Sequence, residues 1–108
     1  MKTFKQFLRE MDHLELLAYI WAKQHYKMPT AEAKYLAQWL VHPDQGNLHD
    51  AAGAATADFL IDFYETTDPD FDGAKIMAAR TRMGKVNLVS DFAFFSFQDY
   101  ARRQGENI

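Results

Sequence analysis

Cysteine is absent from this chain of 108 residues. The protein can therefore form neither a disulfide nor a zinc site with thiolate ligands, which fits a reducing cytoplasm. Long apolar runs are absent too, since no window approaches the ~18 apolar residues that a membrane-spanning helix needs. The chain also lacks a Gly-rich phosphate loop and a nucleophile paired with a base. These absences predict a cytoplasmic protein that does not enter a membrane and is not an enzyme.

Basic side chains are missing from one stretch of the chain. Residues 58–72 contain six acidic residues and no lysine or arginine, whereas residues 73–105 contain six basic residues against two acidic ones. Such a division is typical of two solvated faces, which can meet within the fold, and we favour this interpretation. The alternative is a surface that steers a charged partner.

Apolar residues are abundant and recur at helical spacing. Hydrophobic residues make up 48% of the chain and aromatic residues 15%, which is enough for a core without metal or disulfide staples. Spacings of three and four mark stripes in residues 3–10, 12–26, 30–41, 47–65, 72–83 and 90–105. No linker divides the chain. The sequence therefore predicts an all-α fold: residues 1–108 form a single domain, one compact bundle of five or six short helices.

The helix of residues 47–65 is expected at the centre of this bundle. Asn47 can cap its start, and Asp50 places a carboxylate among its free N–H groups. Further stripe residues are Ala51, Leu60 and Tyr64. The main apolar face is predicted to consist of Leu48, Ala52, Ala55, Phe59 and Phe63.

Capping signals mark where the earlier helices begin. Asp12 and Glu15 have the spacing of an acidic capping box, so they open the second helix. Thr30 follows a Met-Pro step and is predicted to cap the third helix, whose core stripe is Ala33, Leu36, Ala37 and Leu40.

The end of the chain is predicted from similar signals. Asp72 can cap a fifth helix, and Gly84 can end it in the left-handed conformation. Ser90 can cap the last helix, which ends at Gly105. Residues 86–89 fit either a helix or a short extended piece, and the sequence leaves this open.

The acidic loop is one place where a cation could bind. Asp68, Asp70 and Asp72 alternate before a glycine, as in the opening of an EF-hand calcium loop. The twelfth loop position is Ala79 instead of a bidentate glutamate, and the eighth is Lys75. We therefore expect weak or absent cation binding, with the aspartates serving turns and a helix cap.

The histidines allow a second hypothesis. His25, the pair His49 and Asp50, and a later aspartate such as Asp91 follow the order found in metal-dependent HD phosphohydrolases. Because a turn and not an apolar helix precedes the pair, this interpretation is the least favoured. We expect no metal site and no cofactor.

The second and third predicted helices allow a third hypothesis, a nucleic-acid-binding helix-turn-helix. The DNA-reading helix would then carry only one basic side chain. Arg80, Arg82 and Lys85, which lie outside that helix, would have to neutralise the phosphates. The overall acidic balance makes nucleic acid an unlikely partner. The side chains available for reading are Glu32, Lys34, Tyr35, Gln38 and Trp39.

Apolar and aromatic residues form a series over the first 65 positions. Its members are Phe4, Phe7, Leu8, Leu17, Ala18, Tyr26, Met28, Pro29, Tyr35, Leu36, Leu40, Phe59, Phe63 and Tyr64. Residues 3–65 thereby resemble the YozE-like family of small bacterial proteins, whose helical bundle is similar to SAM domains. That family usually has a Phe-Pro step and a Tyr-Leu-Glu ending of the third helix, where this chain has Met28-Pro29 and Trp39-Leu40. The resemblance implies the same fold class and no established activity.

These observations favour a non-enzymatic helical interaction or regulatory module. Its partner is expected to be another protein or a second copy of the chain in a homodimer. Trp39 is predicted to be partly exposed, because Leu36 and Leu40 define the buried side of its helix. The candidate binding residues are Tyr35, Trp39, Arg80 and Arg82.

Overall fold

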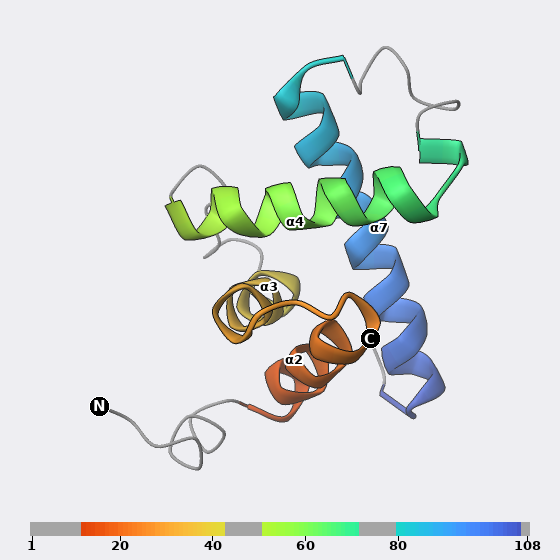
Figure 1. Ribbon diagram of the computed structural model, residues 1–108. Coiled ribbons are helices and arrows are strands. Elements are labelled where there is room, and N and C mark those ends of the chain that lie inside the picture. The colour runs from red at the N-terminus through yellow and green to blue at the C-terminus, as the bar shows by residue number, and fades with distance from the viewer. Residues whose placement is uncertain (1–11, 43–50, 72–79, 107–108) are drawn as a thin grey trace.

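The computed structural model describes residues 12–42, 51–71 and 80–106. They form four helices: α2 (His13–His25), α3 (Thr30–Val41), α4 (Ala51–Thr67) and α7 (Arg82–Arg103) (Figure 1). The all-α prediction is thus confirmed, and the number of five or six helices is corrected to four in the described part. The predicted helix of residues 3–10, and most of the one predicted for residues 72–83, lie outside the described residues.

Helices α2 and α3 form a hairpin with the most extensive helix–helix contact in the described part of the chain. Helix α4 lies across α3, and the long helix α7 crosses α4 and continues past α2 (Figure 1). The residues after α7 return to the start of α2, where His13 Nε2 lies 2.5 Å from Glu106 Oε1. All four helices therefore contribute to one core.

The cap predicted for the second helix is confirmed. The Glu15 backbone N–H donates to Asp12 Oδ1 over 2.7 Å, which satisfies a free donor of the first turn of α2. After α2, Lys27 has a φ of 57°, a left-handed conformation that reverses the chain within a few residues. Met28 then enters the core and is 1% exposed.

The core stripe of α3 is also confirmed, because Ala33, Leu36 and Ala37 are fully buried and Leu40 is nearly so. The cap of this helix was predicted wrongly. Pro29 occupies the N-cap position without a side-chain hydrogen bond, and Thr30 is the first helical residue. Proline is favourable just before a helix because its φ is already close to the helical value.

The buried face of α4 agrees with the predicted one in part, since Leu60 and Tyr64 of the predicted stripe are buried. Ala51 and Ala55 are exposed and Phe59 and Phe63 are only partly buried, while Asn47, Leu48 and Asp50 lie outside the described residues. The prediction failed for Ala51 and Ala55, because alanines occur all around this helix and give no clear stripe, and the side chain of Ala52 lies outside the described part of the chain. The residues that face the core are Gly53, Thr56, Ala57, Leu60 and Tyr64.

The start of α7 was also predicted wrongly. Its N-cap is Thr81, whose hydroxyl oxygen accepts from the Gly84 N–H over 2.9 Å, so Gly84 does not end a helix. Residues 86–89 are helical, and Ser90 is an interior residue whose hydroxyl donates to the Asn87 carbonyl. The end was predicted correctly: α7 stops at Arg103, and Gly105 has a φ of 89°.

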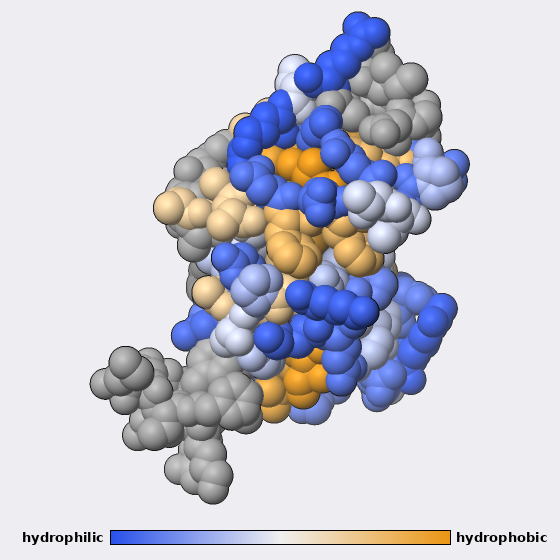
Figure 2. Space-filling view, viewed as in Figure 1, coloured by the Kyte–Doolittle hydropathy of each residue, from blue (hydrophilic) through white to orange (hydrophobic). Residues whose placement is uncertain are grey.

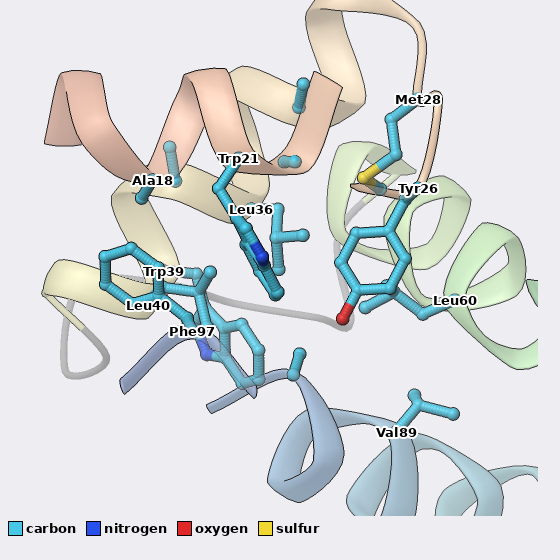
Figure 3. Packing of buried hydrophobic residues seen from close by; sticks show 14 of the residues in the cluster. Ala18, Trp21, Tyr26, Met28, Leu36, Trp39, Leu40, Leu60, Val89 and Phe97 are labelled. Carbon is cyan, nitrogen blue, oxygen red and sulfur yellow. The ribbon is translucent and has the colours of Figure 1, made fainter. Parts of the chain in front are cut away.

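The core is rich in aromatic side chains. Trp21, Leu36 and Phe97 point from α2, α3 and α7 into the same space (Figure 3). Burying each such side chain stabilises the fold by about 1.5–3 kcal/mol. In the space-filling view, apolar patches bounded by hydrophilic side chains lie above α4 and over α2 (Figure 2). None of the described helices combines the length and apolar character needed to cross a membrane.

Candidate functional site

An open groove of about 470 Å³ lies between α2 and α7. Its size falls within the range of roughly 300–1,000 Å³ that is usual for ligand pockets. The lining positions recur at spacings of three and four on both helices, so each helix presents one face to the groove. The lining residues are Trp21, Gln24, His25, Ser96, Asp99, Tyr100 and Arg103.

Stacked rings form the aromatic part of this lining. The rings of Trp21 and His25 are nearly parallel, with centroids 5.1 Å apart and an interplanar angle of 10°. Tyr100 lies on the other side of the groove, with its ring centroid 6.3 Å from that of Trp21 and an angle of 29°. Phe97 supports Trp21 from α7 at 5.6 Å. The rings hold one another in place, so the groove is preorganised.

His25 is a neutral polar group in this setting. Partial burial beside the rings of Trp21, Tyr26 and Phe63 lowers the pKa of His25 below its usual value of 6.5. Its side chain makes no hydrogen bond to any residue in the described part of the chain. A neutral imidazole can donate and accept hydrogen bonds, so His25 is available to a ligand.

Arg103 supplies a positive charge at the rim. Its guanidinium Nη2 lies 2.8 Å from Asp99 Oδ2, and both side chains are largely exposed. Exposed ion pairs of this kind contribute only about 0–1 kcal/mol. A carboxylate from a ligand can therefore replace Asp99 at little cost.

The inner wall of the groove is connected to a buried pair of tyrosines. The Ser96 side chain hydrogen-bonds Tyr64, and the hydroxyl groups of Tyr26 and Tyr64 lie 2.6 Å apart. Burial raises the pKa of Tyr26 well above its usual value, and the neighbouring Tyr64 raises it further. Burial is also the main cause of the raised pKa of Tyr64. Both hydroxyl groups therefore stay protonated, and their hydrogen bond stabilises the packing of the helices.

The binding residues predicted from sequence are not brought together. Trp39 is 8% exposed, so the prediction that it is partly exposed is wrong; the ring of Phe94 covers it at a centroid distance of 4.8 Å. Tyr35 is partly buried, and Arg80 is exposed just before α7. Arg82 Nη2 lies 3.3 Å from Asp58 Oδ1.

The acidic and basic stretches meet within the fold. Besides the pair of Arg82 and Asp58, Lys85 Nζ lies 2.5 Å from Glu65 Oε1. These contacts join α7 to α4 and agree with the interpretation of two faces that meet. Because these ion pairs neutralise part of the acidic and basic stretches, less unpaired charge remains on the surface to steer a charged partner.

Parts of the metal hypotheses lie outside the described residues, namely Asp72, Lys75 and Ala79 of the acidic loop and the pair His49 and Asp50. In the described part of that loop, the Asp70 N–H donates to Asp68 Oδ1 over 2.9 Å, which is the contact of a turn. Of the proposed HD residues, His25 lies in the groove and Asp91 is exposed on α7.

The groove was not predicted because Trp21 has the spacing of a core residue within the apolar stripe of residues 12–26. Two signals were present in the sequence: Gln24 and His25 follow Trp21 at helical spacing, and Ser96, Asp99 and Arg103 recur likewise. Neither pattern shows by itself that the two faces meet.

The described residues form an all-α fold with an open groove between α2 and α7. The comparisons with known proteins add no relative: no family model, curated protein or solved structure matches this chain. The resemblance of residues 3–65 to the YozE-like family stays a prediction.

Proposed function

We propose that this chain is a small, cytoplasmic, non-enzymatic interaction module that binds a protein partner through the groove between α2 and α7. The observation that carries the proposal is the grouping of Tyr100 and Arg103 along one groove, over the buried ring of Trp21. Tryptophan, tyrosine and arginine are the residues that contribute most often to hot spots of protein interfaces. We therefore propose this groove as the binding surface, instead of the surface around Tyr35 and Trp39 that the sequence predicts.

The partner is expected to present a short segment with a planar or aromatic side chain next to a carboxylate. The planar group would stack on the accessible rings of His25 and Tyr100, which the buried ring of Trp21 supports. The carboxylate would pair with Arg103, whose present ion pair is exposed and weak. His25 and Gln24 would complete the polar contacts.

The groove also contains the residue types of a serine hydrolase, but their contacts support binding over catalysis. Such an enzyme needs a serine hydroxyl hydrogen-bonded to a histidine that a carboxylate orients. Here Ser96 hydrogen-bonds Tyr64, and Asp99 pairs with Arg103. His25 therefore has neither partner that a catalytic base requires.

Self-association is the second candidate function. The side chain of Phe95 on α7, which is 69% exposed and is not part of the groove lining, favours it as an anchor for a second copy. Pairing of acidic with basic patches across a two-fold axis gains less support, because Asp58 and Glu65 already pair with Arg82 and Lys85. Nucleic-acid binding, and after it an HD-like hydrolase, are less favoured alternatives.

The proposal can be tested by site-specific photo-crosslinking in the cells that produce the protein. We expect a crosslinker at Gln24, on the groove, to give a defined adduct that disappears in Arg103→Ala. A crosslinker at Gln38, exposed on α3 outside the groove lining, is the matched control. An adduct with a second copy of the chain would favour self-association. Equal adducts from both positions, or an adduct that survives Arg103→Ala, would contradict the proposed groove.

A further inference from the structure

A second cluster of polar side chains lies outside the groove, where the start of α2 meets the end of α3. Its members are Asp12, Glu15 and His42, each of which offers one ligand atom, and these atoms lie within 4.8 Å of one another. His42 Nε2 lies 2.7 Å from Glu15 Oε1 and 3.5 Å from Asp12 Oδ2. The tertiary structure brings the histidine to two carboxylates that are 27 and 30 positions earlier in the chain.

We propose that Asp12, Glu15 and His42 form a binding site for a divalent metal ion of the zinc type. Imidazole nitrogen and carboxylate oxygen are both ligands of zinc, with bonds of about 2.0–2.2 Å. Neighbouring ligand atoms of a tetrahedral zinc site are then about 3.4 Å apart. The separation of 3.5 Å between His42 Nε2 and Asp12 Oδ2 matches this value. The separation of 2.7 Å between His42 Nε2 and Glu15 Oε1 is that of a hydrogen bond, so these two side chains must move apart by about 0.7 Å to admit the ion.

The helix cap holds Asp12 in the orientation that the site needs. Its Oδ1 atom accepts the hydrogen bond from the Glu15 N–H, and its Oδ2 atom is the one near His42. One oxygen is therefore occupied by the cap while the other remains for the metal. Because Asp12 is anchored before any ion arrives, binding loses less side-chain entropy than it would with a mobile ligand.

The exposure of the three side chains fits an ion that enters from solvent. The Glu15 side chain is 15% exposed, that of His42 39% and that of Asp12 53%. Three protein ligands leave at least one coordination position for water. An ion held there would connect the start of α2 to the residue that follows α3.

The ligand set favours zinc and related transition metals over calcium or magnesium. Calcium and magnesium prefer sites made of oxygen atoms alone, whereas imidazole suits zinc, nickel and copper. The two carboxylates compensate the charge of a divalent ion. The simpler alternative is that His42 and Glu15 form a hydrogen-bonded pair and bind nothing.

Calorimetric titration of the full chain, without a histidine tag, by zinc chloride tests the proposal. We expect one zinc ion per chain and an affinity that falls at least about tenfold in His42→Ala and in Glu15→Gln. Asp12→Asn should weaken binding as well, while asparagine keeps the helix cap. The matched control is His13→Ala, because His13 also lies at the start of α2 but contacts Glu106.

Cobalt(II) provides a second readout that does not depend on folding stability. Its visible absorption should show a protein-bound ion in the wild type and in His13→Ala, and lose that signal in His42→Ala. Zinc should also raise the melting temperature of the wild type and leave that of His42→Ala unchanged, since a ligand stabilises only the state that it binds. Absence of zinc binding, or equal affinity in the wild type and His42→Ala, would overturn the proposal and leave a hydrogen-bonded pair only.

Discussion

Contacting aromatic rings extend from a buried pair, Tyr26 and Tyr64 (the inner end), to the groove between α2 and α7 (the outer end). At the inner end Tyr26 and Tyr64 are buried, and their hydroxyl groups satisfy each other over 2.6 Å. At the outer end His25 and Tyr100 line a groove over the ring of Trp21, which is itself only 5% exposed. Three helices, α2, α4 and α7, meet at the inner end, whereas α2 and α7 alone line the outer end. The comparison indicates that α4 buries the polar groups of the inner end. Because α4 contributes no residue to the groove lining, the polar side chains of the groove stay available to a ligand.

The largest effect is expected where the two ends join. Phe97 is 2% exposed and supports Trp21, so Phe97→Ala should lower the free energy of unfolding by about 3–5 kcal/mol. Urea denaturation measures this change. The matched control is Phe95→Ala, two positions along α7, where the side chain is 69% exposed and the expected change is within about 0.5 kcal/mol. An equal loss of unfolding free energy in both variants would contradict the packing of Phe97 against Trp21 described above.

The next effect belongs to the inner end. Tyr64→Phe removes one hydroxyl group and leaves that of Tyr26 buried without its partner, which should cost about 1–3 kcal/mol. The double variant Tyr26→Phe/Tyr64→Phe should cost less than the sum of the two single changes, because it leaves no unpaired hydroxyl group at this contact. A double-mutant cycle by urea denaturation measures the coupling. Strict additivity would mean that the two hydroxyl groups do not depend on each other.

A smaller effect is expected at the outer end, through His25. Because burial lowers its pKa in the folded protein, the unfolded chain binds the proton more readily. The contribution of His25 to stability is therefore complete above about pH 6.5 and is lost as the pH falls from there towards the folded pKa. Comparison of the wild type with His25→Gln between about pH 8 and pH 5 isolates this contribution, since all other histidines are kept. The same pH dependence in both proteins would exclude it.

The smallest effect on stability, with the largest effect on binding, is expected at Arg103. Its exposed pair with Asp99 contributes little, so Arg103→Ala should change the free energy of unfolding by less than about 1 kcal/mol. The same change should abolish capture of the partner at the groove. Arg102→Ala is the matched control, because Arg102 is exposed beside it but does not line the groove. Loss of capture in both variants would point to a general charge effect instead.

Sequence patterns predicted several local features of the fold. The cap at Asp12, the buried stripe of α3 and the end of α7 at Gly105 each depend on residues within one or two helical turns. Other local signals failed, since Thr30 does not cap α3 and α7 begins before Gly84 and Ser90. The remaining failures concern packing: α4 exposes Ala51 and Ala55, and Trp39 is covered by Phe94, which lies 55 positions later.

The two candidate sites depend on contacts between distant segments. The groove joins residues 21–25 with residues 96–103, and the proposed metal site joins Asp12 and Glu15 with His42. Local spacing fits a core position for Trp21 and predicts a helix cap at Asp12, and the structure agrees with both. Neither revealed the second role, because the spacing within one helix contains no information on which other helix will face it.

Local sequence patterns are therefore sufficient to show that this protein is helical and to place some of its helix ends, such as the start of α2 and the end of α7. Hydrogen bonds and caps within a helix join residues up to four positions apart, so a short window of sequence contains much of this information. Which aromatic rings are covered, where the groove opens and which carboxylates His42 meets follow from the packing of the helices. Those outcomes depend on how the helices pack, and packing is a property of the whole bundle.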